Sequence, residues 1–455
     1  MGSGSSPVRA SGHSRSSVRV FDRPLLRALP VALGFLVVAC ASAPPSGLLG
    51  AYRFDDGGLV SIRRSPEHTL RYREFETGRS GRLYRETSGR YVSGEGFVGR
   101  DPVELVVEFV ADDVGTAREL RWNQDGTIRV ARRVGIEERV EFESDGTRLV
   151  GRLHLPEGPE PHPALVLVHG SGDSPGSEWF YNGDFLVAHG VAVLAYDKRG
   201  SGRSGGDFTF DFHQLARDVV AAVDFLATRP DIRSDAIGLS GYSQGGWVAP
   251  LAASMTRRVR CVLVSYGMIE SPAEEARLEM LHLVREGGAD ESNLEQADRL
   301  VRAAVKVVAS GFQEGWDELN ALDDEFDGAP WRESLDGTPV DRVTKYPNWI
   351  IRWIGPSQAP KGLPWDYDST DLLESTDVPM AWFLGSEDES APNRQTITKL
   401  RAWEAAGRPV QLTVFEGADH GMLVFHEEDG RRVYTGYAPG YFSAEVDAAR
   451  RLLAP

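Results

Sequence analysis

Cysteine is scarce in this sequence, which excludes a disulfide framework. Cys40 lies at the end of an N-terminal apolar segment, and Cys261 lies within the apolar run 259–264. Structural zinc sites need cysteine or histidine ligands at close spacing, whereas the histidines and aspartates here are scattered along the chain. We therefore expect Cys261 to be a buried core thiol, and we expect no metal site and no cofactor.

Long hydrophobic runs and an excess of positive charge are also missing. The apolar stretch at residues 31–39 offers about nine residues, whereas a helix that crosses a bilayer needs about 20. The formal net charge is −17 at pH 7, with 50 lysines and arginines against 67 aspartates and glutamates. Because a chain so acidic has no basic patch to neutralise phosphates, nucleic acid is excluded as a partner.

The first 39 residues are nevertheless typical of an export signal. Five arginines and one aspartate are followed by the apolar stretch, and the small residue Ala39 stands directly before Cys40. This ending resembles the lipobox of bacterial lipoproteins, in which the cysteine becomes the lipidated first residue. We expect an extracytoplasmic protein anchored to a membrane through Cys40, with a linker over residues 40–47; a secreted or periplasmic protein is the alternative. Removing the signal would change the formal net charge to −21.

Residues 48–134 predict a small all-β domain. Short runs of β-forming residues are separated by turn sequences such as Asp55-Asp56-Gly57-Gly58 and Asp125-Gly126, a spacing that suits an antiparallel sandwich or barrel. The predicted strands cover residues 59–62, 70–75, 103–110, 120–122 and 127–130. No catalytic cluster appears there, so we expect a structural appendage rather than a module that binds or shapes the substrate.

From residue 135 to 455 the pattern changes to strands that alternate with helices. Continuous apolar runs at 164–168 and 191–196 are typical of buried parallel strands, and the apolar periodicity of 212–226 is typical of a crossover helix. This alternation predicts an α/β fold with a doubly wound, mostly parallel sheet. Residues 271–377 interrupt it and predict an inserted helical cap, whose first two helices begin at capping boxes that start with Ser271 and Ser292. Five of the ten tryptophans fall in the cap, and we expect them mainly in its core, with one or two walling a pocket.

The pattern G-x-S-x-G, in which a tight strand-to-helix turn exposes a serine, occurs three times, at Ser174, Ser204 and Ser243. Only Ser243 has an apolar strand before it and a helical segment after it. Residues 200–205 also match G-x-G-x-x-G, but they neither follow a strand directly nor open a helix, so we discount a dinucleotide site.

A serine nucleophile needs a base, and the base needs an acid that orients it. The loop after the strand that ends at Leu384 offers Asp388, which we favour over Glu387, and the loop after Phe415 offers His420, which we favour over His426. Each of these loops lies at the carboxyl end of a strand, where open α/β sheets bind their ligands.

With Ser243, Asp388 and His420 in this order, residues 135–455 resemble the α/β-hydrolase superfamily. The resemblance makes Ser243 the nucleophile, Asp388 the acid and His420 the base, and the segment His169-Gly170-Ser171-Gly172 is similar to the family's oxyanion loop. The two turns place the backbone N–H groups of Ser171 and Gln244 as the expected oxyanion donors.

These expectations indicate an exported serine hydrolase that cleaves a small-molecule carboxylic ester through an acyl-enzyme. Two other activities of the same fold stay open, a serine peptidase or aminopeptidase and a thioesterase. A peptidase would need an anchor for the peptide terminus, such as Glu274 or Glu275, although both are equally explained as helix N-terminal charges. An alternative from another class is a non-catalytic surface binding protein.

Overall fold

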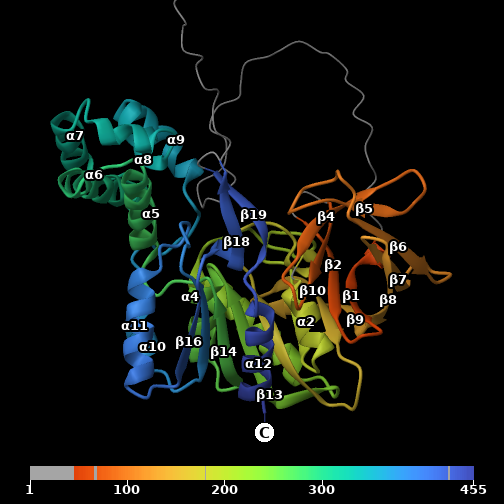
Figure 1. Cartoon of the computed structure of the whole chain (residues 1–455). Coiled ribbons are helices and arrows are strands. Elements are labelled where there is room, and N and C mark those ends of the chain that lie inside the picture. Colours follow the sequence, from red (N-terminus) through yellow and green to blue (C-terminus); the bar gives the residue numbers. More distant parts are fainter. Residues whose placement is uncertain (1–45, 66–68, 180, 429–430, 455) are drawn as a thin grey trace, which may run out of the picture.

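The structure is a computed structural model that describes residues 46–65, 69–179, 181–428 and 431–454 (Figure 1). The expected signal sequence, Cys40 and most of the linker lie outside these residues. Among the helices of the described ranges, none combines the length and the apolar character needed to cross a membrane.

The N-terminal part is a closed barrel of eight antiparallel strands in sequence order, in which the last strand pairs with the first. Its interior is filled by side chains, among them Tyr72 and Trp122, whose ring centroids are 5.1 Å apart. A small all-β unit is thus confirmed, but β1, β4 and β5 were not predicted, because they are short or carry glycine and charged residues. The bounds are β1 Gly50–Phe54, β2 Leu59–Arg64, β3 Leu70–Glu74, β4 Ser80–Arg85, β5 Tyr91–Ser93, β6 Leu105–Ala111, β7 Ala117–Gln124 and β8 Thr127–Val134, preceded by the 3-10 turn Ser46–Leu48.

The larger part is built on an eight-stranded sheet in the order β16-β15-β14-β13-β11-β12-β10-β9. β10 runs antiparallel to the other strands of this sheet. It forms a hairpin with β9 through Asp145 and Gly146, which both have positive φ (48° and 73°). All other neighbouring pairs are parallel. The strands are β9 Ile136–Ser144, β10 Thr147–Leu155, β11 His162–Val168, β12 Ala192–Tyr196, β13 Ile232–Tyr242, β14 Val259–Ser265, β15 Met380–Gly385 and β16 Val410–Phe415.

Helices cover both faces of this sheet, as the alternating pattern predicted (Figure 1). One apolar layer packs α3, α4, α10 and α11 on the sheet, and the layer on the other face packs α2 and α12. Cys261 of β14 is a buried free thiol, as expected, and burial raises its pKa to about 12. The helices are α1 Gly176–Trp179, α2 Asn182–Ala188, α3 Phe212–Ala227, α4 Gly245–Met255, α10 Thr370–Ser375, α11 Arg394–Ala405 and α12 Tyr441–Leu452.

Between β14 and α10 the chain forms a group of helices that projects from the sheet (Figure 1). This cap has its own apolar core, which includes Trp316 and Trp331. Ser271 caps α5 as predicted, but α6 begins earlier than the predicted box at Ser292, because the Asp290 carboxylate accepts from the Asn293 backbone N–H. The bounds are α5 Pro272–Glu286, α6 Glu291–Ala309, α7 Trp316–Glu325, the 3-10 turn Pro330–Leu335, α8 Pro339–Lys345 and α9 Asn348–Gln358.

A second, three-stranded sheet follows the main sheet and was not predicted. It is formed by β17 Ala418–Asp419, β18 Leu423–Glu428 and β19 Arg431–Tyr437. Its strands carry many charged residues and no clear alternation, so the sequence signal is weak. The sheet surrounds the turn that carries His420.

Polar and aromatic contacts join the barrel to the larger part. Arg63 of β2 donates to both carboxylate oxygens of Asp184 on α2 (2.8 and 2.5 Å), and Ser61 donates to the same carboxylate. Arg63 and Asp184 are both buried, with side chains 2% and 3% exposed. Phe75 adds an apolar contact to Phe185, with ring centroids 5.1 Å apart. The barrel is therefore packed on the larger part through a buried interface.

Candidate active site

Ser243 lies in a sharp turn between β13 and α4, at the carboxyl end of the central strand. Its φ is 54°, in the left-handed region that non-glycine residues seldom adopt, and its backbone N–H donates to the Ser265 carbonyl (3.1 Å). Such a conformation costs about 1–3 kcal/mol and persists where the surroundings enforce it. The turn thus holds the serine hydroxyl out from the sheet edge.

Two glycines of the motif are required by close approach of the backbone. A Cβ on Gly241 would lie 2.2 Å from the Gly245 carbonyl oxygen, and a Cβ on Gly245 would lie 2.3 Å from the Val168 oxygen. The second contact joins the serine turn to the end of β11, where the oxyanion loop begins. Glycine at these positions therefore lets the two loops pack against each other.

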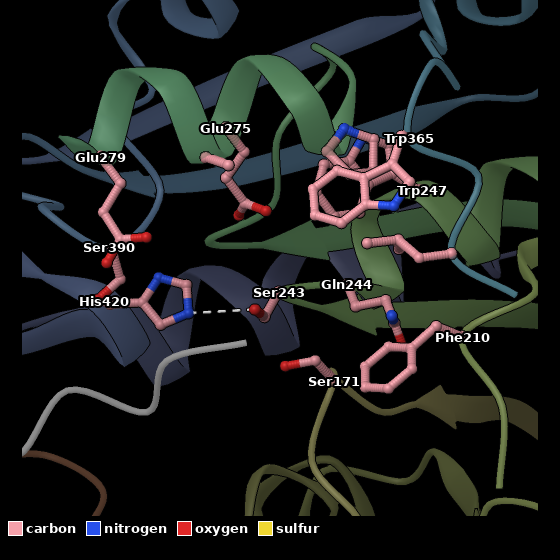
Figure 2. Close-up of a pocket in the computed structure, with 13 residues that line it drawn as sticks. Ser171, Phe210, Ser243, Gln244, Trp247, Glu275, Glu279, Trp365, Ser390 and His420 are labelled. Carbon is pink, nitrogen blue, oxygen red and sulfur yellow. Dashed lines mark hydrogen bonds between the residues drawn. The ribbon is translucent and has the colours of Figure 1, made fainter. Parts of the chain in front are cut away.

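The structure brings the three predicted triad residues together. His420 Nε2 lies 3.2 Å from Ser243 Oγ, and His420 Nδ1 lies 2.9 Å from Asp388 Oδ2 (Figure 2 shows the first contact). The Asp388 side chain is fully buried and also accepts from the Ala391 backbone N–H (2.8 Å). Burial alone would lower the pKa of His420, but the charge and hydrogen bond of Asp388 outweigh it and raise the pKa above its ordinary value. These contacts have the geometry that a nucleophile, a base and an orienting acid would need.

The other residues considered for the acid, the base and the nucleophile do not take part in the contacts among Ser243, His420 and Asp388. Glu387 is exposed beside Asp388, and His426 is exposed on β18. Ser204 donates to the Asp197 carbonyl (2.6 Å) and accepts from the Val150 N–H (2.9 Å), so it fixes a turn. Ser174 lies in the loop before α1. Of the three G-x-S-x-G serines, all within the described ranges, only Ser243 lies within hydrogen-bond distance of a histidine.

The expected oxyanion donors are the backbone N–H groups of Ser171 and Gln244. Both residues line the pocket above the serine (Figure 2). Within the part of the chain that the structure describes, neither backbone N–H donates to a protein acceptor. Donors left unpaired at the mouth of a pocket are available to an incoming oxygen atom.

Lys198 lies beneath this loop and was missed in the sequence. It is buried, and its Nζ donates to the Gly170 carbonyl (2.8 Å) and to the Gln244 side chain (3.2 Å). The Gly170 carbonyl belongs to the same peptide group as the Ser171 N–H, so the ammonium orients and polarises that donor. Burial lowers the pKa of Lys198 to about 7. Lysine in the turn after β12 gave no sequence signal for such a role, because lysine is usually exposed.

A pocket of about 660 Å³, part of it open to solvent, lies above Ser243 and below α5 of the cap. Trp247, Trp365 and Phe210 form apolar walls, and Glu275 and Glu279 of α5 lie across the pocket from Ser243 and His420 (Figure 2). Of the five tryptophans in the inserted segment, Trp365 lines this pocket. Trp349 and Trp353 are 70% and 79% exposed and lie neither in this pocket nor in the apolar core of the cap. None of the described residues that line this pocket comes from the barrel.

Comparison with known proteins identifies the family. The profile of the alpha/beta hydrolase family matches residues 165–435, well over half of the chain. The chain therefore belongs to the alpha/beta hydrolase family, and the resemblance seen in the sequence is confirmed.

Curated relatives match over shorter stretches. The chain is 33% identical over 130 residues to the 2,6-dihydropseudooxynicotine hydrolase of Paenarthrobacter nicotinovorans, covering 28% of this chain and 34% of that protein. It is 34% identical over 152 residues to the thiohydrolase aneE of Aspergillus aculeatus, covering 32% of this chain and 47% of that protein. The matches thus span between a third and a half of these relatives. Among solved structures, the alpha/beta hydrolase GrgF from Penicillium has 20% sequence identity and a TM-score of 0.43, over 70% of this chain and 100% of that one.

Proposed function

We propose that the protein is a serine hydrolase that cleaves a carboxylic ester through an acyl-enzyme. The observation that carries the proposal is the continuous set of contacts from Ser243 through His420 to Asp388, at 3.2 and 2.9 Å. This set lies under a pocket with apolar walls that suits a small organic substrate. A surface protein that only binds would have no need for these contacts.

In the proposed cycle, Ser243 Oγ attacks the carbonyl carbon of the ester while His420 Nε2 takes its proton. The Ser171 and Gln244 N–H groups donate to the oxyanion, and each such donor contributes on the order of 3 kcal/mol to lowering the barrier. His420 then protonates the leaving alcohol, and the ester bond breaks to leave acyl-Ser243. Water, deprotonated by His420, attacks the acyl-enzyme and releases the acid, while Asp388 orients the imidazole and stabilises its charge throughout.

The test is a panel of matched substrates on the purified protein. We expect carboxylic esters to be hydrolysed with a kcat/KM at least about 10-fold above that of aminoacyl amides with the same acyl group, because an alcohol is expelled more easily than an amine when the acyl-enzyme forms. Thioesters are included because a relative is called a thiohydrolase. A clear preference for the amides or thioesters would replace the ester assignment, and no turnover of any member together with no labelling by a fluorophosphonate would overturn the serine-hydrolase proposal.

We also propose that Cys40 is lipidated and anchors the protein to a membrane on the extracytoplasmic side. The support is the arginine-bearing segment, the apolar stretch and Ala39 directly before the cysteine. A Cys40→Ser variant of the full-length chain is expected to move from the membrane fraction to the soluble fraction after export. Unchanged partition between the two fractions would contradict the anchor and leave simple secretion or another attachment.

A further inference from the structure

Two carboxylates of the cap face the catalytic residues across the pocket. Glu275 and Glu279 lie one turn apart on α5, so their side chains leave the same face of the helix. Both line the pocket that contains Ser243, and the Glu275 side chain points from α5 toward Ser243 and His420 (Figure 2). The pocket therefore carries acidic groups directly above the serine that attacks the substrate.

No lysine or arginine of the described chain forms an ion pair with Glu275. The basic group that acts on it is His420, and the other charges acting on it are those of Glu279 and Asp388. The nearest arginine on α5, Arg277, is taken by Glu274 (2.5 Å) and Asp298 (2.5 Å). Burial and then the Glu279 charge raise the pKa of Glu275 to about 8. A cation brought by the substrate would lower this pKa again, so Glu275 would bind the cation as an ionised carboxylate.

The remaining walls of the pocket suit a cation. Trp247 and Trp365 line it beside Glu275, and Phe210 lines it near Gln244 (Figure 2). Among the described lining residues there is no lysine or arginine. Aromatic faces and carboxylates together form the usual environment for ammonium groups, whereas an anionic substrate would be repelled.

This inference rests on the proposed function and concerns the substrate of the same site. We infer that the ester carries a positive charge, an ammonium group that binds between the Glu275 and Glu279 carboxylates and the indole faces of Trp247 and Trp365. The ammonium group belongs either to the acyl chain or to the alcohol. The chemistry of recognition is the same in both cases, and the experiment separates them.

The experiment uses two pairs of esters, each with a cationic member and a neutral isostere in which the ammonium group is replaced by a methyl-bearing carbon. In one pair the ammonium lies on the acyl chain, and in the other on the alcohol. The full chain is expected to hydrolyse the cationic member of one pair with a kcat/KM at least about 10-fold above that of its isostere. The pair that shows the preference identifies the half of the ester that carries the charge.

Variants of the two glutamates test which side chain causes the preference for the cationic ester over its neutral isostere. Glu275→Gln keeps the shape of the side chain and removes its charge, and it is expected to bring the ratio of the cationic to the neutral ester close to one; Glu279→Gln should lower the same ratio. Glu274→Gln is the matched control, because Glu274 is the neighbouring residue on α5, is paired with Arg277 and does not line the pocket. This control is expected to keep the ratio of the unaltered protein.

The outcomes distinguish the two proposals. Equal kcat/KM values within both pairs, with the neutral esters hydrolysed, would overturn the cationic substrate and leave the serine hydrolase intact. The cationic substrate would also be overturned if the Glu275→Gln variant kept the preference for the cationic ester. It would be overturned as well if the unaltered protein favoured neutral esters that accept a hydrogen bond, because the Glu275 carboxyl would then act as a hydrogen-bond donor. Absence of turnover for all four esters, together with no labelling of Ser243 by a neutral fluorophosphonate, would overturn both.

Discussion

A Ser243→Ala variant is expected to lose ester hydrolysis by about 10⁴-fold or more and to lose labelling by a fluorophosphonate completely. In the proposed mechanism the side chain at this position supplies the atom that forms the acyl-enzyme, and loss of the nucleophile from a triad costs nearly as much as loss of the whole triad. The residual rate would come from the oxyanion donors and from substrate binding. The measurements are kcat/KM for the best ester of the panel and the fraction of protein labelled.

The sequence provides a matched control for this variant. Ser174 is centred in another G-x-S-x-G match but lies in the loop before α1. Ser174→Ala is expected to keep kcat/KM within about twofold, as surface loop substitutions generally do. If Ser243→Ala were labelled as well as the unaltered protein, the nucleophile would have to be another residue.

An Asp184→Ala variant is expected to lower the free energy of unfolding by about 3–5 kcal/mol. Asp184 accepts from Ser61 and twice from Arg63, and its removal leaves the Arg63 guanidinium buried at 2% exposure with a single carboxylate partner, Glu137. A buried charge that loses its main partner keeps its desolvation cost without the compensating attraction. Urea denaturation followed by circular dichroism gives the change.

Two further variants define the cause of that loss. Arg63→Met combined with Asp184→Leu removes both charges and is expected to recover most of the stability, because replacing a buried pair by apolar groups is often neutral. Asp55→Ala breaks the exposed pair with Arg132 and is expected to cost less than about 1 kcal/mol. If Asp184→Ala cost no more than Asp55→Ala, the pair would not be important for joining the barrel to the rest of the molecule.

The parts of the fold that the sequence predicted well are those with strong local patterns. The apolar runs 164–168 and 191–196 became the buried strands β11 and β12, and the Asp125-Gly126 turn has positive φ values (50° and 83°) in the hairpin between β7 and β8. The strands β4 and β5 of the barrel and the hairpin β18–β19 were not predicted. Each pairs with a strand adjacent in the sequence, but these segments are short or rich in charged residues and glycine and lack a clear alternation of apolar and polar residues.

At the site, the sequence predicted the residues that complete a known motif after a strand, and it missed two residues of types that are usually exposed. Ser243, Asp388 and His420 could be placed because each follows a recognisable strand. Lys198 and Glu279 could not, since a buried lysine and a helical glutamate look like surface residues in a sequence. Glu275 was weighed only as a possible peptide anchor, and its position above Ser243 depends on how α5 of the cap lies over the sheet.

The separate apolar core of the cap has a consequence for how this protein can change over evolution. The groups proposed to make and break bonds lie on loops of the main sheet, whereas Glu275, Glu279 and their supporting helices belong to a segment inserted between β14 and β15 with a core of its own. Substitutions or exchanges in that segment alter what enters the pocket without moving the reacting atoms. New substrate preferences can therefore arise, in nature or by engineering, from recombination of the cap alone.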